Sequence, residues 1–296
     1  MGERRVLITG GSGFIGSHLV RKFSEHGDRV TVMDIRRPDY ELDDMGTFVQ
    51  RDIFDPKALK SLVEDADDII HLVGLADSRL VQNDPMKSFR LNIVSLQNVL
   101  EVCREAGQKK IIFPSSAAVY GTTDDLPIKE NSPPNLTNTY SWHKFICERM
   151  IQAYQKNYDL RYVILRLFNV YGKGNEGVIG LFIDRAKKGE TIEPFGPFQY
   201  RDFVYAGDVA EAIYHAVVYD KAVNRTINIG TGKGTQIREI LDMICGIYPG
   251  AKWKELRTNF IMYDSIADIT LARILLDFNP RSSPEFLKRI ITEEMI

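Results

Sequence analysis

With 296 residues, 44% of them hydrophobic and 26% charged, the chain has the composition of an ordinary globular protein and length for about two domains or one elaborated domain. A formal net charge of −2 gives no electrostatic reason to expect nucleic acid or an anionic membrane as a partner. No stretch approaches the ~20 apolar residues of a membrane span, and the residues before the first apolar run are too few for a secretory signal. We therefore expect a cytoplasmic protein.

The cysteines and histidines point away from a metal centre. Cys103, Cys147 and Cys245 lie far apart in the sequence and form no CxxC pair, which predicts free thiols rather than a disulfide framework or a zinc site. The five histidines show no metal-ligand spacing, so no metal is assigned.

Short apolar runs alternate with helix-length amphipathic segments through the first part of the chain, as in βαβ units with a parallel sheet. Strands are predicted at residues 6–8, 29–34, 47–50, 68–73, 110–114 and 161–167. Helices are predicted at residues 14–26, 56–64, 85–106 and 140–157.

Beyond residue 168 the alternation loosens, and glycines and prolines recur through residues 169–200. Strand patterns return at 203–205 and 226–229, and helix patterns follow at 209–218, 237–247, 267–276 and 284–292. We predict an α/β fold with a doubly wound parallel sheet and a smaller, discontinuous second domain. The nucleotide-binding domain would comprise residues 1–168 plus about 203–228, and the substrate domain about 169–202 and 229–296.

Glycines mark the turn between the first strand and the first helix. Gly10, Gly13 and Gly16 allow a tight turn, close approach of the backbone to a pyrophosphate, and close helix–strand packing. Phe14 and Ile15 open the helix, whose first N–H groups can bind the anion. This pattern is typical of a Rossmann dinucleotide site.

Asp34 ends the second strand, 18 residues after Gly16, where a carboxylate accepts a hydrogen bond from an adenosine ribose. A carboxylate there also repels a 2′-phosphate, which favours NAD over NADP, although Arg36 and Arg37 lessen that preference. Asp52 and Ile53 follow the third strand and could contact the adenine; a loop aspartate without that role is the alternative.

Three residues supply redox chemistry. Tyr140 and Lys144 are four residues apart, so they share one face of the predicted helix. A free phenol ionises only near pH 10, and a nearby ammonium and the cationic nicotinamide ring both favour phenolate. Ser116, at the carboxyl edge of the sheet, can hydrogen-bond the same substrate oxygen. His143 points away from Lys144 on a helix and is predicted to be a surface or packing residue.

These residues carry a family resemblance. The chain resembles an extended short-chain dehydrogenase/reductase of the nucleotide-sugar epimerase/dehydratase group, similar to UDP-glucose 4-epimerases, over nearly its whole length. The resemblance rests on segments 9–16, 113–121, 140–144, 166–172, 175–179, 201–205 and 228–232.

The resemblance implies NAD as cofactor and a nucleotide-diphosphate sugar, most simply a UDP-sugar, as substrate. It implies that Ser116, Tyr140 and Lys144 are catalytic, and that Tyr140 and Lys144 also contact the cofactor. Asn169, Val178 and Arg201 would bind the substrate, with Ser116. A homodimer through the helices at 85–106 and 140–157 is implied as well.

Within the family, Ala117 and Ala118 occupy positions where 4,6-dehydratases carry Asp-Glu, so dehydration lacks its acid and base. The predicted reaction is 4-epimerisation: transient oxidation at the sugar C4 by Tyr140, Lys144 and Ser116, then re-reduction on the opposite face. The alternative is an NAD(P)H-dependent nucleotide-4-keto-sugar reductase of deoxysugar biosynthesis, and a non-catalytic dinucleotide sensor is a third reading. The family's nucleotide clamp in the tail is not evident; residues 257–260 are the nearest stretch.

Overall fold

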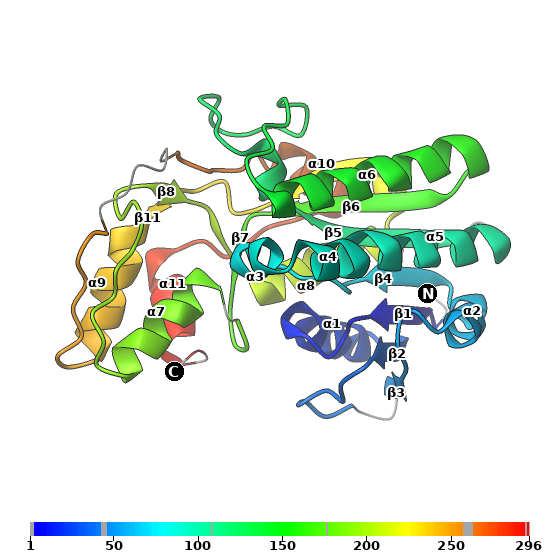
Figure 1. Ribbon diagram of the computed structural model, residues 1–296, viewed down its shortest axis with the longest axis horizontal. Coiled ribbons are helices and arrows are strands. Elements are labelled where there is room, and N and C mark those ends of the chain that lie inside the picture. Colours follow the sequence, from blue (N-terminus) through cyan, green and yellow to red (C-terminus); the bar gives the residue numbers. More distant parts are fainter. Residues whose placement is uncertain are drawn as a thin grey trace.

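The computed structural model describes residues 3–42, 46–107, 109–175, 177–256, 263–293 and 295. A larger body surrounds a central sheet, and a smaller lobe containing α7, α9 and α11 lies beside it (Figure 1). The first described residues belong to the larger body, and the last belong to the smaller lobe.

The central sheet has seven strands, and every pair in it is parallel. Its order is β10-β6-β5-β4-β1-β2-β3. The strands are β1 (Arg5–Thr9), β2 (Arg29–Asp34), β3 (Gly46–Gln50), β4 (Asp68–His71), β5 (Lys110–Ser116), β6 (Arg161–Leu167) and β10 (Arg225–Ile229). The chain winds outward from β1 through β2 and β3, then returns to β4 on the other side. Ligands of such sheets bind at this switch point, at the carboxyl ends of the strands.

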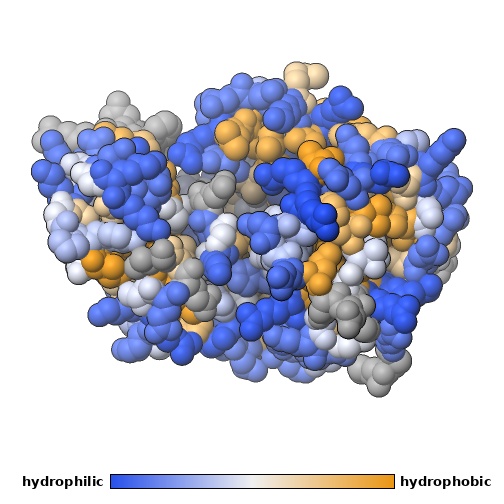
Figure 2. All heavy atoms as spheres, turned by 90° about the horizontal axis from the view of Figure 1, so that it is seen from below, coloured by the Kyte–Doolittle hydropathy of each residue, from blue (hydrophilic) through white to orange (hydrophobic). Residues whose placement is uncertain are grey.

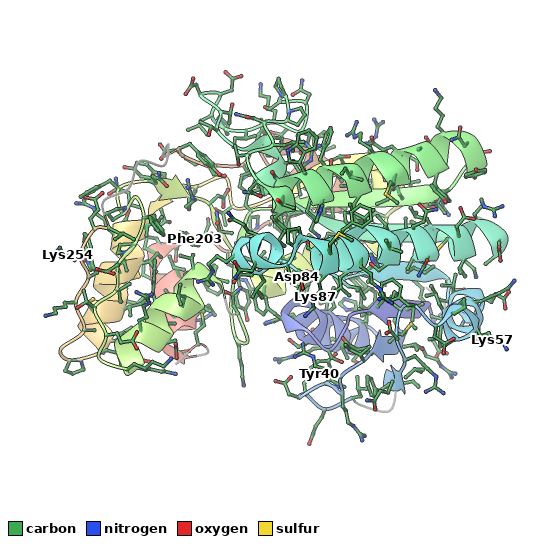
Figure 3. All side chains as sticks on the ribbon, in the orientation of Figure 1. Tyr40, Lys57, Asp84, Lys87, Phe203 and Lys254 are labelled. Carbon is green, nitrogen blue, oxygen red and sulfur yellow. The ribbon has the colours of Figure 1, made fainter. Side chains whose placement is uncertain are left out.

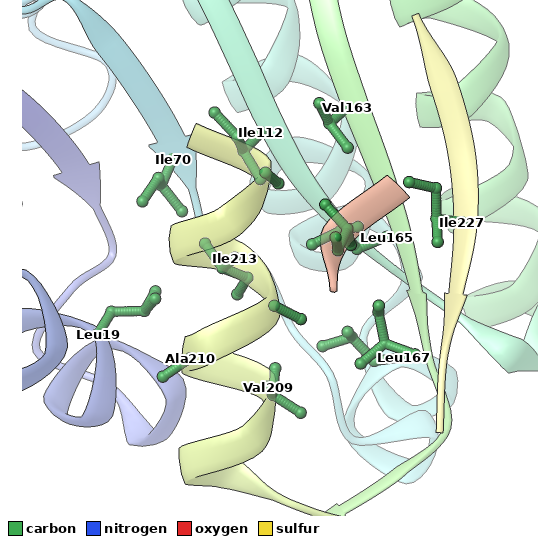
Figure 4. Packing of buried hydrophobic residues seen from close by; sticks show 14 of the residues in the cluster. Leu19, Ile70, Ile112, Val163, Leu165, Leu167, Val209, Ala210, Ile213 and Ile227 are labelled. Carbon is green, nitrogen blue, oxygen red and sulfur yellow. The ribbon is translucent and has the colours of Figure 1, made fainter. Parts of the chain in front are cut away.

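Helices cover both faces of the sheet because its strands are apolar on both sides. On one face, α1 (Phe14–Glu25) and α8 (Ala206–Val218) pack on alternate strand residues, among them Ile70, Ile112 and Leu165 (Figure 4). On the other face, α2 (Pro56–Asp65), α5 (Ser95–Glu105) and α6 (Thr139–Tyr158) pack on the intervening ones. The doubly wound α/β prediction is confirmed.

The smaller lobe has a hydrophobic cluster of its own. It is formed by α7 (Val178–Lys187), α9 (Ile237–Ile247) and α11 (Pro284–Glu293). Two short sheets adjoin it: β7 (Asn169–Tyr171) with β9 (Phe203–Tyr205), and β8 (Tyr200–Arg201) with β11 (Thr235–Gln236). By contrast, α10 (Thr270–Leu276) packs through Ala272 and Leu276 into the cluster beneath β10 and α8. The proposed substrate domain therefore includes one helix that packs on the nucleotide-binding side.

The structure corrects several predicted boundaries. The single helix expected at 85–106 is three joined segments: α4 (Pro85–Phe89), a π-helical turn (Arg90–Val94) and α5. Strand β5 extends to Ser116, which therefore ends the strand instead of following it. The sequence prediction also missed α3 (Ser78–Asn83), β7 and α7. Single 3-10 turns occur at Ala117–Tyr120 and Asp220–Ala222.

Within the described residues, none of the helices combines the length and apolar character that crossing a bilayer requires. On the face shown in Figure 2, hydrophilic residues predominate and hydrophobic residues gather in separate patches.

Candidate active site

Two glycines of the loop between β1 and α1, Gly10 and Gly16, have no room for a side chain. Gly10 has a positive φ of 74°, and a Cβ on it would lie 2.7 Å from the backbone nitrogen of Val73. A Cβ on Gly16 would lie 1.9 Å from the carbonyl oxygen of Gly11, so only glycine allows α1 to approach the loop this closely. Gly13 precedes the first turn of α1, and no side chain caps that turn. This cradle fits the pyrophosphate of a dinucleotide, which the free N–H groups at the start of Phe14–Glu25 would bind.

Asp34 lies next to this loop. Its Oδ2 accepts a hydrogen bond from the backbone N–H of Ser12 at 3.1 Å, and its Oδ1 accepts one from that of Arg36 at 3.1 Å. Tyr40, not predicted to take part, donates from its hydroxyl to the carbonyl oxygen of Gly11 at 2.7 Å, and Figure 3 labels it near α1. The carboxylate is therefore held beside the cradle, where the sequence predicts contact with a ribose.

Asp52 and Ile53 occupy different environments. Asp52 is exposed, and its carboxylate accepts a hydrogen bond from the N–H of Phe54 at 3.0 Å. Ile53 is buried in the cluster beneath α2 and α5. Their contact with the adenine stays a prediction.

Helix α6 brings Tyr140 and Lys144 to the end of β5. Asn138 caps the helix in a reciprocal capping box with Ser141, so Tyr140 stands in the first turn. One turn later, the ammonium of Lys144 donates to the carbonyl oxygen of Pro114 at 2.9 Å and lies 4.8 Å from the centre of the Phe113 ring.

Ser116 lies two residues beyond Pro114, at the carboxyl end of β5. Its hydroxyl accepts a hydrogen bond from the N–H of Ala118 at 3.2 Å, and the residue is half-buried, as are Tyr140 and Lys144. The strand end and the first turns of α6 thus gather the three predicted catalytic residues at one edge of the sheet. The following Ala117 and Ala118 bring no acid or base.

His71 ends β4 below this group and is fully enclosed. Its Nδ1 lies 2.8 Å from the hydroxyl of Thr9, and its Nε2 lies 3.3 Å from that of Ser95. Burial, and to a lesser degree the positive charge of Lys144, lowers the pKa of His71 to about 3. The imidazole of His71 is therefore neutral, because a protonated ring would be desolvated and also repelled by the ammonium of Lys144.

Asn92 is a buried polar residue that the sequence prediction missed. From the π-helical turn, its Oδ1 accepts from the N–H of Leu75 at 2.8 Å, and its Nδ2 donates to the hydroxyl of Ser88 at 3.1 Å. That hydroxyl lies 2.9 Å from Nδ1 of His143. His143 is 7% exposed, so it is the packing residue of the two alternatives. No local sequence pattern predicts the role of Asn92, because its partners lie on two separate segments, the loop at Leu75 and α4 at Ser88.

The predicted substrate residues lie where the larger body meets the smaller lobe. Asn169 stands in β7, and its Nδ2 donates to the carbonyl oxygen of Asp202 at 3.2 Å. Val178 begins α7 and is exposed. Phe203, in the adjacent β9, marks this junction in Figure 3. Glu176, in one segment of the resemblance, and residues 257–260, the stretch nearest to the family's tail clamp, lie outside the described residues.

Arg201 is a half-buried cation. It donates to Oε1 of Gln199 at 2.7 Å and to the carbonyl oxygen of Tyr263, whose ring lies 4.8 Å from the guanidinium carbon. Among the described residues, none of the carboxylates forms an ion pair with it. Burial holds the pKa of Arg201 below its usual value, because the guanidinium has lost part of its hydration. A bound anion would compensate for that loss.

No three His, Cys, Asp or Glu side chains gather as a metal site within the described ranges. All three cysteines are free thiols, and burial raises the pKa of Cys103 and of Cys147 to about 12.

Comparison with known proteins identifies the family. The sequence pattern of the NAD dependent epimerase/dehydratase family matches residues 6–230. The chain belongs to this family. The predictions of the family and of NAD as the cofactor are thereby confirmed. A sequence from Methanocaldococcus jannaschii is 37% identical over 249 residues, covering 81% of each chain.

Two solved structures of the family share the whole architecture. The UDP-N-acetylglucosamine 4-epimerase of Methanobrevibacter ruminantium is 28% identical, with a TM-score of 0.89 and coverage of 100% of this chain and 98% of the other. The UDP-glucose 4-epimerase of Brucella ovis, in complex with NAD, is 31% identical, with a TM-score of 0.88 and coverage of 97% and 96%.

Proposed function

We propose that this chain is an NAD-dependent nucleotide-sugar 4-epimerase. The observation that carries the proposal is the placement of Tyr140 and Lys144 against the end of β5, beside Ser116, at the edge of the sheet where the glycine loop lies. The neighbouring Ala117 and Ala118 leave no group to eliminate water, so oxidation and reduction at one carbon remain. Both named structural relatives are 4-epimerases, which supports epimerisation over the ketoreductase alternative.

In this proposal the side chains of the site manage one proton. Tyr140, as phenolate, accepts the proton of the sugar 4-hydroxyl and later returns it. The ammonium of Lys144 supplies the positive charge of the site, and the Ser116 hydroxyl donates a hydrogen bond to the substrate oxygen. When NAD is bound, it supplies a reversible acceptor for the hydride of the sugar carbon. Gly10, Gly13, Gly16 and Asp34 would hold it, with Phe14, Ile15, Asp52 and Ile53 at its margins.

The substrate needs an anchor while the sugar presents each face in turn. Arg201, half-buried and without an ion pair to a carboxylate among the described residues, is suited to a diphosphate, because charge-assisted hydrogen bonds are the strongest that proteins offer. Asn169 and Val178 lie at the same junction of the larger body and the smaller lobe. The relatives that bind or act on UDP-sugars support a UDP-sugar as substrate.

We also infer a homodimer through α4, α5 and α6. Large apolar side chains on α3, α4 and α6 are exposed: Leu80, Met86, Phe89 and Trp142. Covering them with a second copy would remove apolar surface from water. The expected location of the protein in the cytoplasm stays a prediction.

The test is anomeric-region proton NMR of the purified protein with UDP-glucose, UDP-galactose and their N-acetyl counterparts, plus catalytic NAD. The expected result is the C4 epimer of one sugar without net formation of NADH. Conversion of none of them, with turnover of a 4-keto sugar and NADPH instead, would replace this proposal by the reductase.

A further inference from the structure

Glu148 is a buried carboxylate that the chemistry above does not use. It is 0% exposed and follows Lys144 by four residues, so it lies on the same face of α6. Its Oε1 accepts from the hydroxyl of Ser115 at 2.6 Å and from Nε of Arg166 at 3.0 Å, and its Oε2 accepts from Nη2 of Arg166 at 2.7 Å. Three short hydrogen bonds thus hold one carboxylate.

The donors come from two neighbouring strands. Ser115 on β5 and Arg166 on β6 are direct partners in the register of the sheet. Two residues earlier on each strand, Phe113 and Ile164 pack in the apolar cluster with Cys147 and Ile151 of α6. The layer between α6 and the sheet is therefore apolar up to the carboxyl ends of the strands. There Glu148, Ser115 and Arg166 form a polar group, which we call the clamp.

A clamp of this kind fixes the position of the helix relative to the strands more than it stabilises the fold. Replacing a buried ion pair by apolar residues of similar size is often neutral or stabilising, so stability alone does not require it. Apolar contacts are non-directional, whereas a bidentate arginine–carboxylate pair fixes both distance and orientation. Burial opposes the charge of Arg166, but Glu148 more than offsets this and the pKa of Arg166 is raised.

Arg166 also connects the clamp to residues that precede α6 in the chain, Glu130 and Tyr120. Its Nη1 donates to the carbonyl oxygen of Glu130 at 3.1 Å, and its guanidinium carbon lies 4.8 Å from the centre of the Tyr120 ring. The hydroxyl of Tyr120 donates to Oδ1 of Asn228 at 2.6 Å. The clamp is thus fixed from β10 as well as from β5 and β6.

Three consecutive residues of β5 then have three separate tasks: the Pro114 carbonyl holds Lys144, the Ser115 hydroxyl holds Glu148, and the Ser116 hydroxyl remains for the substrate. We propose that Glu148, through Ser115 and Arg166, is a positioning residue that fixes α6 along β5 and so sets the separation of the Tyr140 and Ser116 hydroxyls. Its kinetic consequence rests on the proposed function. A displacement of about 1 Å costs about 100-fold in rate.

The test replaces the ion pair by apolar residues of similar length, Glu148→Met with Arg166→Met. We expect kcat to fall about 100-fold, while KM for the nucleotide sugar changes less than about threefold, because the proposed anchor is elsewhere. Ser115→Ala, which keeps the ion pair, should lower kcat about tenfold, and Glu148→Gln, which keeps the shape and the Ser115 hydrogen bond, should retain more activity than the double variant.

A matched control exists at the opposite end of the sheet. Lys110 and Asp68 form another buried ion pair, 3.2 Å apart, with both side chains 4% exposed. Asp68→Asn should lower Tm without lowering kcat. If kcat falls by the same factor for a given fall in Tm in Asp68→Asn and in the clamp variants, the positioning role is overturned.

Crystal structures of the wild type and the double variant supply a readout that needs no substrate. The separation of the Tyr140 and Ser116 hydroxyls should change by about 1 Å in a retained fold. An unchanged separation, or a double variant that epimerises at the wild-type rate, refutes the inference and leaves the proposed function standing. A changed separation in a protein that epimerises no sugar refutes the function and leaves the clamp. If the double variant does not fold, Ser115→Ala and Glu148→Gln decide by the same two readouts.

Discussion

The ammonium of Lys144 donates a hydrogen bond of 2.9 Å to the carbonyl oxygen of Pro114. Like the hydrogen bond between Ser115 and Glu148, this contact joins the helix that carries Tyr140 to the strand that ends in Ser116. An ammonium has three donors, so two remain for the cofactor and for water. Lys144 therefore locates the helix and, in the proposed site, also supplies positive charge, so its loss would affect position and electrostatics together. Variants of Tyr140 and Ser116 separate the effect on position from the effect on electrostatics better.

Tyr140→Phe removes the proposed base and changes little else. We expect kcat to fall about 100- to 10,000-fold, the usual range for a general acid–base group, with NAD affinity retained because the glycine cradle is intact. Steady-state rates with the sugar identified by NMR, and titration with NAD, measure both. Tyr158→Phe at the exposed end of the same helix is the control. A turnover within a few-fold of the wild type would remove Tyr140 from its role.

Ser116→Ala removes a hydroxyl that has two duties. It would lose the hydrogen bond to the substrate oxygen and also the one from the N–H of Ala118, which caps the 3-10 turn. We expect a fall in kcat smaller than that of Tyr140→Phe and a loss of about 1 kcal/mol in the free energy of unfolding. Ser116→Thr, which keeps the hydroxyl, should recover most of both. If kcat is unaffected in the alanine variant, the contact with the substrate oxygen does not exist.

Sequence patterns predicted the βαβ core well, since period and glycine position are local properties. The strand end at Asp34 and the helix containing Tyr140 and Lys144 were expected and found. The missed α7 had a signal, apolar residues at spacings of three and four from Ile179 to Ala186, hidden among glycines and prolines. Glu148 had none, because a buried charge is recognisable only once the strands that pair with it are placed.

The glycine cradle gives a prediction about cofactor binding. In Gly16→Ala the new Cβ would lie 1.9 Å from the carbonyl oxygen of Gly11, so the loop must move away from α1. We expect NAD affinity to fall at least about tenfold by calorimetry, because the N–H groups that bind the pyrophosphate shift with the loop. Gly246→Ala is the control, since nothing lies within 4 Å of its added Cβ in α9 and alanine favours a helix. Equal NAD affinity in the Gly16 variant would place the pyrophosphate elsewhere.

Arg201→Ala tests the substrate anchor. Charge-assisted hydrogen bonds contribute about 1.5–3 kcal/mol, so UDP should bind about 10- to 100-fold more weakly to the NAD-saturated variant. Uridine, which lacks the phosphates, should lose little affinity. Arg21→Ala, exposed on α1, is the control for a general change of charge. Equal losses for UDP and uridine would show a damaged lobe rather than a lost phosphate contact.

Buried, neutral His71 should weaken the protein in acid. Its pKa is about 3 in the folded chain and near 6.5 in the unfolded one, so the unfolded chain takes up the proton first. The stabilisation is fully present above about pH 6.5 and is lost as the pH falls towards about 3, by at most about 1.4 kcal/mol per pH unit.

Urea unfolding at several pH values between these limits, compared with His71→Gln, isolates this contribution from that of the carboxylates. The variant should be less stable than the wild type at neutral pH, because its amide cannot reproduce both contacts to Thr9 and Ser95, yet its stability should fall less steeply with acid. His26→Gln, at the exposed end of α1, serves as the comparison. Parallel curves for the wild type and His71→Gln would mean that the imidazole gains its proton without unfolding, and that the space between Thr9, Ser95 and Lys144 admits a second positive charge.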